Sequence, residues 1–282
     1  MADGIGLALG AMMFYGLTDW VYKRAAADGV HAHHFLLLQA LFFAPGIFLY
    51  GLATGTLALG APFLWGMTAG ALVFIALYNF ARSLASGAVS IVAPVFRLSF
   101  AITAALAVWL LGEPLTNWKL AGLTASLAAV WLLLAGGPAS APRASPASLL
   151  RLFVATVAMG IVSLIYKLGA IAGGSPATIL AGQSSVFLPL AALFSLVRER
   201  GFHPPPGAWR YGATAAMLLL CGLLMLLAGL AHGQASVLVP VAQLSFVVTA
   251  GLGFIFMREA LTLRKGFGLA FAVVALVCLA RG

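Results

Sequence analysis

Apolar blocks long enough to cross a lipid bilayer follow one another along almost the whole chain. A transmembrane helix needs about 20 mainly apolar residues. Ten stretches of roughly that length can be placed at 4–21, 34–52, 63–81, 88–111, 115–135, 149–166, 178–197, 209–230, 235–257 and 261–280. The breaks between them are short, so few residues remain for a domain outside the membrane. The sequence therefore predicts an all-α integral membrane protein with ten transmembrane helices.

The composition argues against a surface that faces water. Of 282 residues, 63% are hydrophobic and 7% are charged, whereas a soluble domain carries about 25% charged residues. The formal charge of +9 comes from basic residues that stand singly or in pairs between the apolar blocks. We therefore expect membrane anchoring and no nucleic-acid partner. Cys221 and Cys278 lie within apolar blocks, which predicts buried thiols and no disulfide.

The basic residues also predict how the chain is oriented. Of the 15 Lys and Arg residues, eleven fall on one set of alternate loops and three on the other set, and Arg97 lies within a helix. Because cytoplasmic loops carry the excess of Lys and Arg, the first set is placed in the cytoplasm and both termini are placed outside it. The expected location is a bacterial-type inner membrane with periplasmic termini. No basic region precedes the first block, so we interpret it as a retained helix and not as a signal peptide.

An internal repeat is the most informative pattern in the chain. Residues 85–136 and 231–282 align without a gap at an offset of 146. This alignment pairs Pro94 with Pro240, Leu98-Ser99-Phe100 with Leu244-Ser245-Phe246, Thr103 with Thr249, Glu113 with Glu259, and Lys119 with Lys265. A weaker match at an offset of 144 pairs Tyr22-Lys23 with Tyr166-Lys167 and Gln39 with Gln183.

Each copy of the repeat contains five helices, and an odd number means that the two copies cross the membrane in opposite directions. The expected division is a first repeat at 1–137, a linker at 138–148 and a second repeat at 149–282. Inverted repeats of this kind place the substrate near the bilayer midplane, where the two copies meet.

Two short segments at matching places carry a family resemblance. Gly112-Glu113-Pro114-Leu115-Thr116 and Arg258-Glu259-Ala260-Leu261-Thr262 each follow a proline-containing helix. They resemble the EamA domain of the drug/metabolite transporter superfamily, and the resemblance extends over the chain as two copies. It implies a 5+5 helical bundle, alternating access and export of metabolites such as amino acids. Within the superfamily, the chain is most similar to YddG-type exporters of aromatic amino acids.

Arg97 is the main candidate for a substrate contact. It aligns with Gln243, and each lies about ten residues into its helix, which is a depth of about 15 Å. A charged side chain at that depth needs a partner or a water-filled cavity. Asp19 is the one carboxylate expected within the membrane, and Lys23 lies one helical turn after it. Arg97 is therefore expected either to await a substrate carboxylate or to bind backbone carbonyls.

Aromatic and amide side chains at helical positions complete the predicted substrate site. A phenol or an amide at membrane depth needs a hydrogen-bond partner. A ring and a carboxylate together would suit an aromatic amino acid. The candidates besides Arg97 are Tyr15, Tyr78, Asn79, Phe96, Gln243 and Ser245. Packing within the bundle is the alternative role for the aromatic residues.

Proline, glutamate and histidine residues are given other roles. Pro94 and Pro240 lie at equivalent points inside helices, so we expect them to act as hinges or to expose backbone to a cavity. Glu113 and Glu259 lie where one helix ends, and they are expected to cap the helix that follows. His31, His33 and His34 lack a further ligand in fixed geometry, so no metal site is predicted.

The expected function is a secondary transporter that exports small metabolites, most of all amino acids. It is expected to act as a monomer in the lipid bilayer and without a cofactor. Export of cationic drugs or of other metabolites is the alternative within the superfamily, and a membrane channel is a further alternative. An intramembrane enzyme is disfavoured because the sequence has no HExxH motif and no paired carboxylates at membrane depth.

Overall fold

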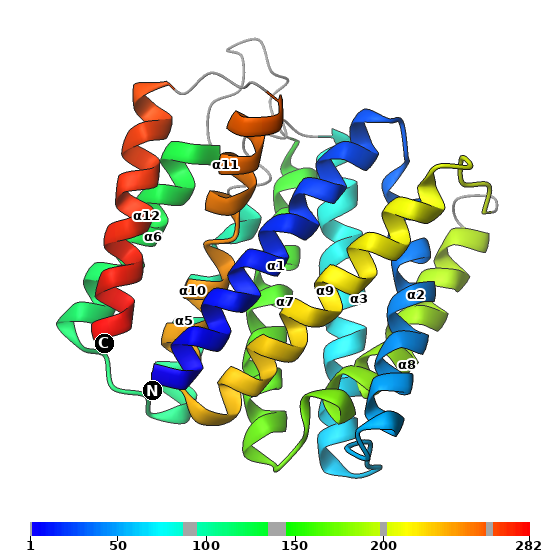
Figure 1. Ribbon diagram of the computed structural model, residues 1–282, viewed down its shortest axis with the longest axis horizontal. Helices are drawn as coiled ribbons and strands as arrows, with labels where there is room; N and C mark the ends of the chain where they lie inside the picture. The colour runs from blue at the N-terminus through cyan, green and yellow to red at the C-terminus, as the bar shows by residue number, and fades with distance from the viewer. Residues whose placement is uncertain (1, 87–94, 135–144, 198–201, 258–261) are drawn as a thin grey trace.

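The computed structural model describes residues 2–86, 95–134, 145–197, 202–257 and 262–282, and these residues form helices joined by short turns (Figure 1). No strand occurs within these ranges. The helices are α1 (Ala2–Ala27), α2 (Ala32–Ala53), α3 (Ala61–Ser86), α5 (Ser99–Leu111), α6 (Asn117–Leu134), α7 (Pro146–Ile171), α8 (Pro176–Val197), α9 (Ala208–His232), α10 (Ala235–Gln243), α11 (Phe246–Met257) and α12 (Leu263–Arg281).

Most of these helices have the length and the composition of membrane spans. Within the described ranges, eight segments are long and apolar enough to cross a bilayer, and Val95–Leu111 forms a shorter apolar helix. Large apolar side chains stay exposed on their outer faces, including Leu52, Leu193 and Ile255. Such a surface suits lipid and not water. The chain is therefore a multi-pass membrane protein, and each of the ten predicted ranges contains a helix.

Two of the predicted helices are interrupted. The prediction of one continuous helix over 235–257 is wrong, because Leu244 and Ser245 form a turn between α10 and α11. The amide of Ser245 donates to the carbonyl oxygen of Ala242 at 3.3 Å, a tighter i+3 bond that ends the α-helical pattern. Leu98, which is aligned with Leu244, likewise separates helical residues 95–97 from α5. Pro240 lies inside α10, one turn before the break, and Pro94 lies outside the described residues.

Glycines allow α3 and α8 to pack very closely. A Cβ atom on Gly66 would lie 2.0 Å from the carbonyl oxygen of Ile179, and one on Gly70 would lie 2.3 Å from that of Gln183. From α8, a Cβ atom on Gly182 would lie 2.2 Å from the carbonyl oxygen of Phe63. Real Cβ atoms do not approach this closely, so these three positions require glycine. The close approach holds the Gln183 turn of α8 against α3.

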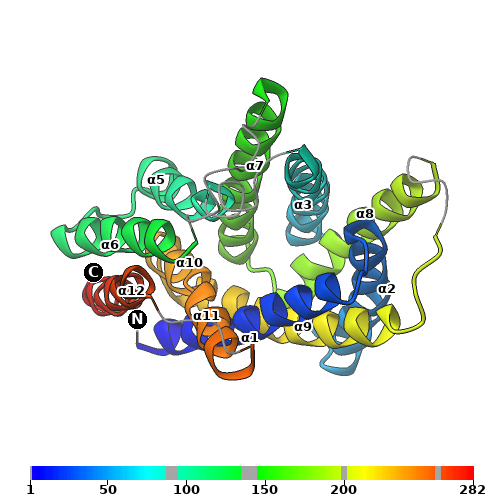
Figure 2. The same ribbon diagram turned by 90° about the horizontal axis from the view of Figure 1, so that it is seen from above.

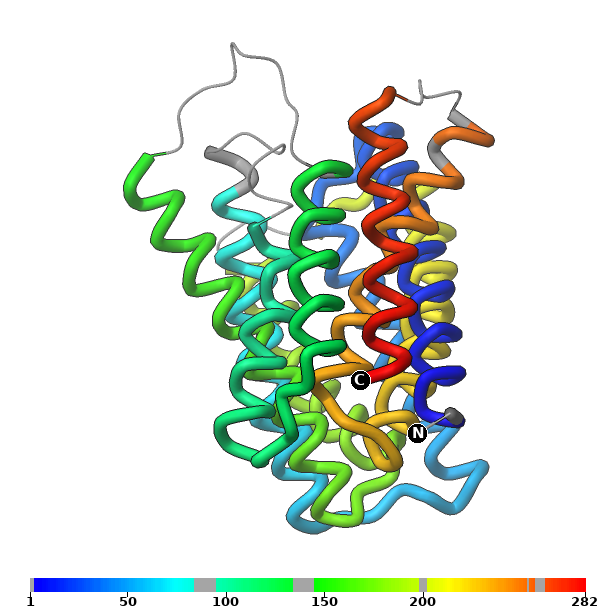
Figure 3. The backbone as a smooth tube through the Cα atoms, turned by 90° about the vertical axis from the view of Figure 1, so that its left-hand side faces the viewer, coloured from blue at the N-terminus to red at the C-terminus, as the bar shows by residue number. Residues whose placement is uncertain are grey.

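The helices are arranged in a bundle with one helix pair at its side. Seen from above, α6 and α12 lie next to each other at one end of the molecule, whereas α2 and α8 lie at the other end (Figure 2). Between them, α1 packs along α9, and α3 packs against both α7 and α8. The two termini lie at the same end of the bundle (Figure 3). The crossing of α1, α2, α3, α8 and α9 encloses the space described next.

Candidate functional site

A small cavity lies among five helices of the bundle. This inner cavity has a volume of about 70 Å³. None of the described residues that line it is charged. Its lining residues are Tyr22, Gln39, Ala40, Phe43, Ala44, Val73, Leu77, Gln183, Ser184, Phe187, Leu188 and Leu219. A mainly apolar space with a few convergent polar groups is the usual form of a small-molecule site.

Matching faces of α2 and α8 form much of the inner cavity. Each helix contributes four residues with the spacing i, i+1, i+4 and i+5, which lie on one face of a helix. The four from α2 are 39, 40, 43 and 44, and the four from α8 are 183, 184, 187 and 188. Every residue of the first set is separated from its counterpart by 144 positions, since 183 − 39 = 144. Pro45 and Pro189, also 144 apart, lie inside the two helices just beyond these faces.

The same hydrogen bond occurs on both helices. The hydroxyl of Tyr22 donates to Oε1 of Gln39 at 2.7 Å, and the hydroxyl of Tyr166 donates to Oε1 of Gln183. Both pairs are 17 residues apart in the sequence. Nε2 of Gln39 also donates to the carbonyl oxygen of Ala215 on α9 at 3.4 Å. These bonds fix the amide groups of Gln39 and Gln183 at the wall of the cavity.

A second and larger cavity has aromatic walls. This aromatic cavity has a volume of about 270 Å³ and shares Leu77 and Phe187 with the inner cavity, so the two adjoin. The rings of Phe74 and Tyr78 are stacked with centroids 6.2 Å apart, and the ring of Phe194 meets that of Tyr78 edge-on at 4.8 Å.

The aromatic cavity is electropositive at its wall. Three basic side chains line it, namely those of His31, His33 and Arg82. The guanidinium carbon of Arg82 lies 5.9 Å from the centroid of the Tyr78 ring, a cation–π distance. No acidic side chain is present among the described residues that line this cavity. Its chemistry therefore favours a ring and an anionic group over a cation.

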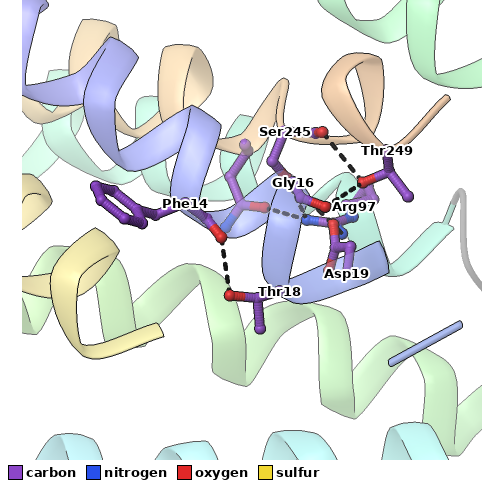
Figure 4. A network of polar contacts seen from close by, with 8 residues as sticks. Phe14, Gly16, Thr18, Asp19, Arg97, Ser245 and Thr249 are labelled. Atoms are coloured by element: carbon purple, nitrogen blue, oxygen red, sulfur yellow. Dashed lines mark hydrogen bonds and ion pairs between the residues drawn. The ribbon is translucent and has the colours of Figure 1, made fainter. Parts of the chain in front are cut away.

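Arg97 lies in a network of polar contacts where α1 meets the break between α10 and α11 (Figure 4). Its Nη1 donates to Oε1 of Gln243 at 3.0 Å and to Oγ of Ser245 at 3.3 Å. Its Nη2 forms an ion pair with the carboxylate of Asp19. The structure thus brings together three of the predicted residues, Arg97, Gln243 and Ser245.

The partners expected for Arg97, a substrate carboxylate or backbone carbonyls, do not include Asp19, which the structure places beside it. The sequence pairs Asp19 with Lys23, one helical turn away, and the structure places the carboxylate of Asp19 in an ion pair with Arg97. Asp19 meets Arg97 because α1 packs on α10 and α11. The spacing of residues within α1 cannot predict this contact between helices. An exposed i, i+4 pair contributes only about 0.5 kcal/mol. A charge at membrane depth has a much stronger need of a partner.

The remaining predicted substrate contacts are spread over the bundle. Tyr78 lines the aromatic cavity. Asn79 donates from Nδ2 to the carbonyl oxygen of Ile75 within its own helix at 2.9 Å. The ring of Phe96 packs on that of Phe80 at 4.3 Å, and Tyr15 packs in the hydrophobic core. Asn79, Phe96 and Tyr15 line neither of the two cavities described above.

Glu113 caps a helix other than the one predicted. Its Oε1 accepts the amide of Ala235 at 2.8 Å and its Oε2 accepts the amide of Ser236 at 2.9 Å, at the start of α10. The helix that follows Glu113 is capped by Thr116, whose Oγ1 accepts the amide of Lys119 at 3.1 Å. Gly112, in the left-handed region at φ 65°, ends α5 before Glu113, and α5 packs against α10. Glu259 lies outside the described residues.

The inner cavity was not predicted from the sequence. The repeat alignment matched Gln39 with Gln183. One matched pair of amides does not predict a binding site, so no function was assigned to them. The cavity can be recognised only from the four residues that each helix contributes on one face. That arrangement becomes visible only once the packing of α2 and α8 is known. The histidines near the aromatic cavity form no group of three possible metal ligands within the part of the chain that the structure describes.

Comparison with known proteins identifies the family. The EamA-like transporter family matches residues 2–135 and 147–281. The chain belongs to this family. This is a family of membrane transporters of the drug/metabolite type, and the residues that line both cavities fall within the matched ranges.

Similar proteins support the fold and add no substrate. A protein of known crystal structure matches 99% of this EamA-like chain and 96% of its own length, with a TM-score of 0.84 and 18% identity. An uncharacterised protein of Methanocaldococcus jannaschii is 30% identical over 69 residues, which are 24% of this chain. The match covers 50% of that relative, so the chain spans about half its length.

Proposed function

We propose that this EamA-like protein is a secondary transporter that exports amino acids and related small metabolites, aromatic amino acids among them, by alternating access. The observation that carries the proposal is the pair of adjoining cavities inside the bundle. One has aromatic walls with a basic side chain, and the other is formed by matching faces of α2 and α8. A substrate with a ring and a carboxylate finds suitable chemistry in this space.

The proposed mechanism rests on two five-helix halves of opposite orientation, residues 1–137 and 149–282 joined by the linker 138–148. Equivalent hydrogen bonds support this division. Oγ1 of Thr103 donates to the carbonyl oxygen of Gly160 at 2.9 Å, and Oγ1 of Thr249 donates to that of Gly16 at 3.0 Å. The two threonines are aligned at the offset of 146, and the two glycines are 144 residues apart. Rocking of one half against the other would expose the inner cavity to each side in turn.

The direction of transport follows from the proposed orientation. The aromatic cavity is lined by His31, His33 and Arg82, and Arg82 belongs to the set of predicted loops that carries eleven of the 15 Lys and Arg residues. If these loops are cytoplasmic, substrate enters the aromatic cavity from the cytoplasm and both termini are periplasmic. A bacterial inner membrane is the proposed location. One chain supplies both halves, so the proposed functional unit is a monomer.

Cationic drugs are a weaker candidate as substrates. Transport of a cation through a low-dielectric cavity needs a compensating negative charge. Among the described residues that line the two cavities, none is acidic. We also assign Arg97 a structural role in place of the substrate contact predicted from the sequence, because Asp19, Gln243 and Ser245 already occupy its guanidinium.

The test is counterflow of labelled amino acids into proteoliposomes that are preloaded with the same unlabelled amino acid. The proposal predicts exchange of phenylalanine and tyrosine by the purified protein, above that of protein-free liposomes. It also predicts that Arg82→Ala raises the KM for these substrates about tenfold through loss of a charge near the carboxylate. Arg151→Ala, an exposed cation on α7 that lines neither cavity, is the matched control. Absence of exchange for every amino acid would refute the substrate assignment and leave the family assignment in place.

A further inference from the structure

One buried hydroxyl at the inner cavity has no hydrogen-bond partner. Ser184 on α8 is 4% exposed, and its Oγ contacts no donor or acceptor among the residues that the structure describes. Its neighbour Ser185 differs, because its Oγ donates to the carbonyl oxygen of Gly182 at 2.7 Å. A buried polar group that lacks a partner is costly, so native proteins rarely retain one without a reason.

The surroundings of Ser184 are polar but uncharged. Gln39, Gln183 and Tyr22 supply amide and hydroxyl groups to the same cavity, and none of the described lining residues carries a formal charge. A carboxylate or an ammonium group moved into this space would lose its hydration without gaining a counter-ion. A neutral hydroxyl or ring N–H would lose much less, and it could bond with Ser184. The inner cavity is therefore suited to a neutral hydrogen-bonding group.

The hydroxyl of Ser184 makes the cavity face of α8 differ from the matching face of α2. The position on α2 that corresponds to Ser184 is Ala40, which lines the same cavity and offers no polar group. Phe43 and Phe187 correspond to each other and are aromatic on both faces. A substrate ring held at these phenylalanines can therefore hydrogen-bond to a serine on one side only, which orients it.

The aromatic cavity adjoins the inner cavity and is also lined by residues of α8. Ser195 on α8 is 1% exposed, lines the aromatic cavity, and also has no partner for its Oγ within the described residues. It lies 11 residues after Ser184, which is about 16 Å along the helix and close to three full turns. The two hydroxyls therefore lie on one face of α8. The two cavities adjoin at Leu77 and Phe187, so the charged end of a substrate can face the aromatic cavity while its ring lies in the inner cavity.

We propose that Ser184 is a specificity-determining residue, which hydrogen-bonds to an uncharged polar group at the ring end of the substrate. The preferred substrates are then aromatic compounds that carry a hydroxyl or a ring N–H, such as phenolic and indolic amino acids, over those with a plain hydrocarbon ring. This inference rests on the proposed transport of aromatic amino acids and names which members of that class are favoured.

The test compares two substrates that differ by one hydroxyl. Transport of tyrosine and of phenylalanine is measured in proteoliposomes, and the ratio of their kcat/KM values is taken for each variant. Because the ratio is internal to each preparation, it does not depend on yield. The parent protein is expected to prefer tyrosine, and Ser184→Ala is expected to lower the tyrosine-to-phenylalanine ratio about five- to tenfold, the effect of one hydrogen bond.

Two variants serve as controls for the hydroxyl. Ser185→Ala removes an adjacent hydroxyl that is already bonded to Gly182, and it should leave the ratio within about twofold of the parent value. Ser184→Thr keeps a hydroxyl at the site and should retain the preference for tyrosine. Loss of the preference in Ser184→Thr to the level of Ser184→Ala would contradict the proposal.

The outcomes separate this inference from the function on which it rests. If the parent protein carries both amino acids and Ser184→Ala leaves their ratio unchanged, the role of Ser184 is refuted and transport of aromatic amino acids stands. If the parent prefers phenylalanine, the role is likewise refuted. If the parent carries neither amino acid, the proposed transport of aromatic amino acids fails, and the inference about Ser184 fails with it.

Discussion

The ion pair between Arg97 and Asp19 should be strongly coupled, and a double-mutant cycle measures that coupling. The two side chains are 22% and 24% exposed, so they are largely removed from solvent. Loss of one partner from a buried pair costs about 3–5 kcal/mol, because the other charge is left without compensation. Gln243 and Ser245 still bind Arg97 in Asp19→Asn, and the pair is partly exposed, so we expect about 2 kcal/mol for each single variant.

The double variant Asp19→Asn/Arg97→Gln removes both charges of this pair, and it should cost only about 1 kcal/mol. The expected coupling energy is therefore about 3 kcal/mol. The assay is unfolding of the purified protein in micelles, followed by the fluorescence of its 6 tryptophans. Asp28→Asn is the control, since the carboxylate of Asp28 accepts from the hydroxyl of Tyr211 at an exposed position. Additive losses, with a double variant near 4 kcal/mol, would refute the ion-pair reasoning.

Three further predictions follow from the contacts between helices. Glu113→Gln should destabilise the protein by about 1–2 kcal/mol in the same unfolding assay, because the charged cap of α10 is lost. Gly66→Ala should cost at least about 2 kcal/mol through its clash with α8, whereas Gly6→Ala, which has open space, should change stability little. Tyr166→Phe leaves Gln183 without its donor in a buried site and should cost about 1–3 kcal/mol. Equal stability of Gly66→Ala and Gly6→Ala, or of Tyr166→Phe and the parent, would contradict the packing described here.

Much of the fold is predictable because membrane helices obey a simple length rule. Apolar blocks of about 20 residues gave a helix in every predicted range. The break at Leu244 and Ser245 was missed, because hydropathy stays high across it and the proline that precedes it is compatible with a continuous kinked helix. The hydropathy of the sequence thus locates the helices. A break within a helix depends instead on the polar side chains that pack against it.

The candidate site was predicted less well, since it depends on which helices touch. The repeat alignment paired Arg97 with Gln243, and the two side chains are hydrogen-bonded in the structure. It could not reveal Asp19 as a further member of the network, because that contact comes from a helix outside the aligned segment. Likewise, Gln39 and Gln183 become meaningful only when the faces of α2 and α8 are seen to line one cavity. The glycine contacts between α3 and α8 hold Gln183 in place. Nothing in the sequence marks these glycines as part of a functional site.

The central claim is that substrate passes through the inner cavity, and filling that cavity tests it most directly. Ala40 is 5% exposed and lines the cavity, whereas its neighbour Leu41 is 38% exposed on the outer surface. Counterflow of labelled tyrosine should be abolished in Ala40→Phe, since the added ring takes up most of a space of about 70 Å³, and it should persist in Leu41→Phe. Transport by folded Ala40→Phe at the rate of the parent protein would contradict the account.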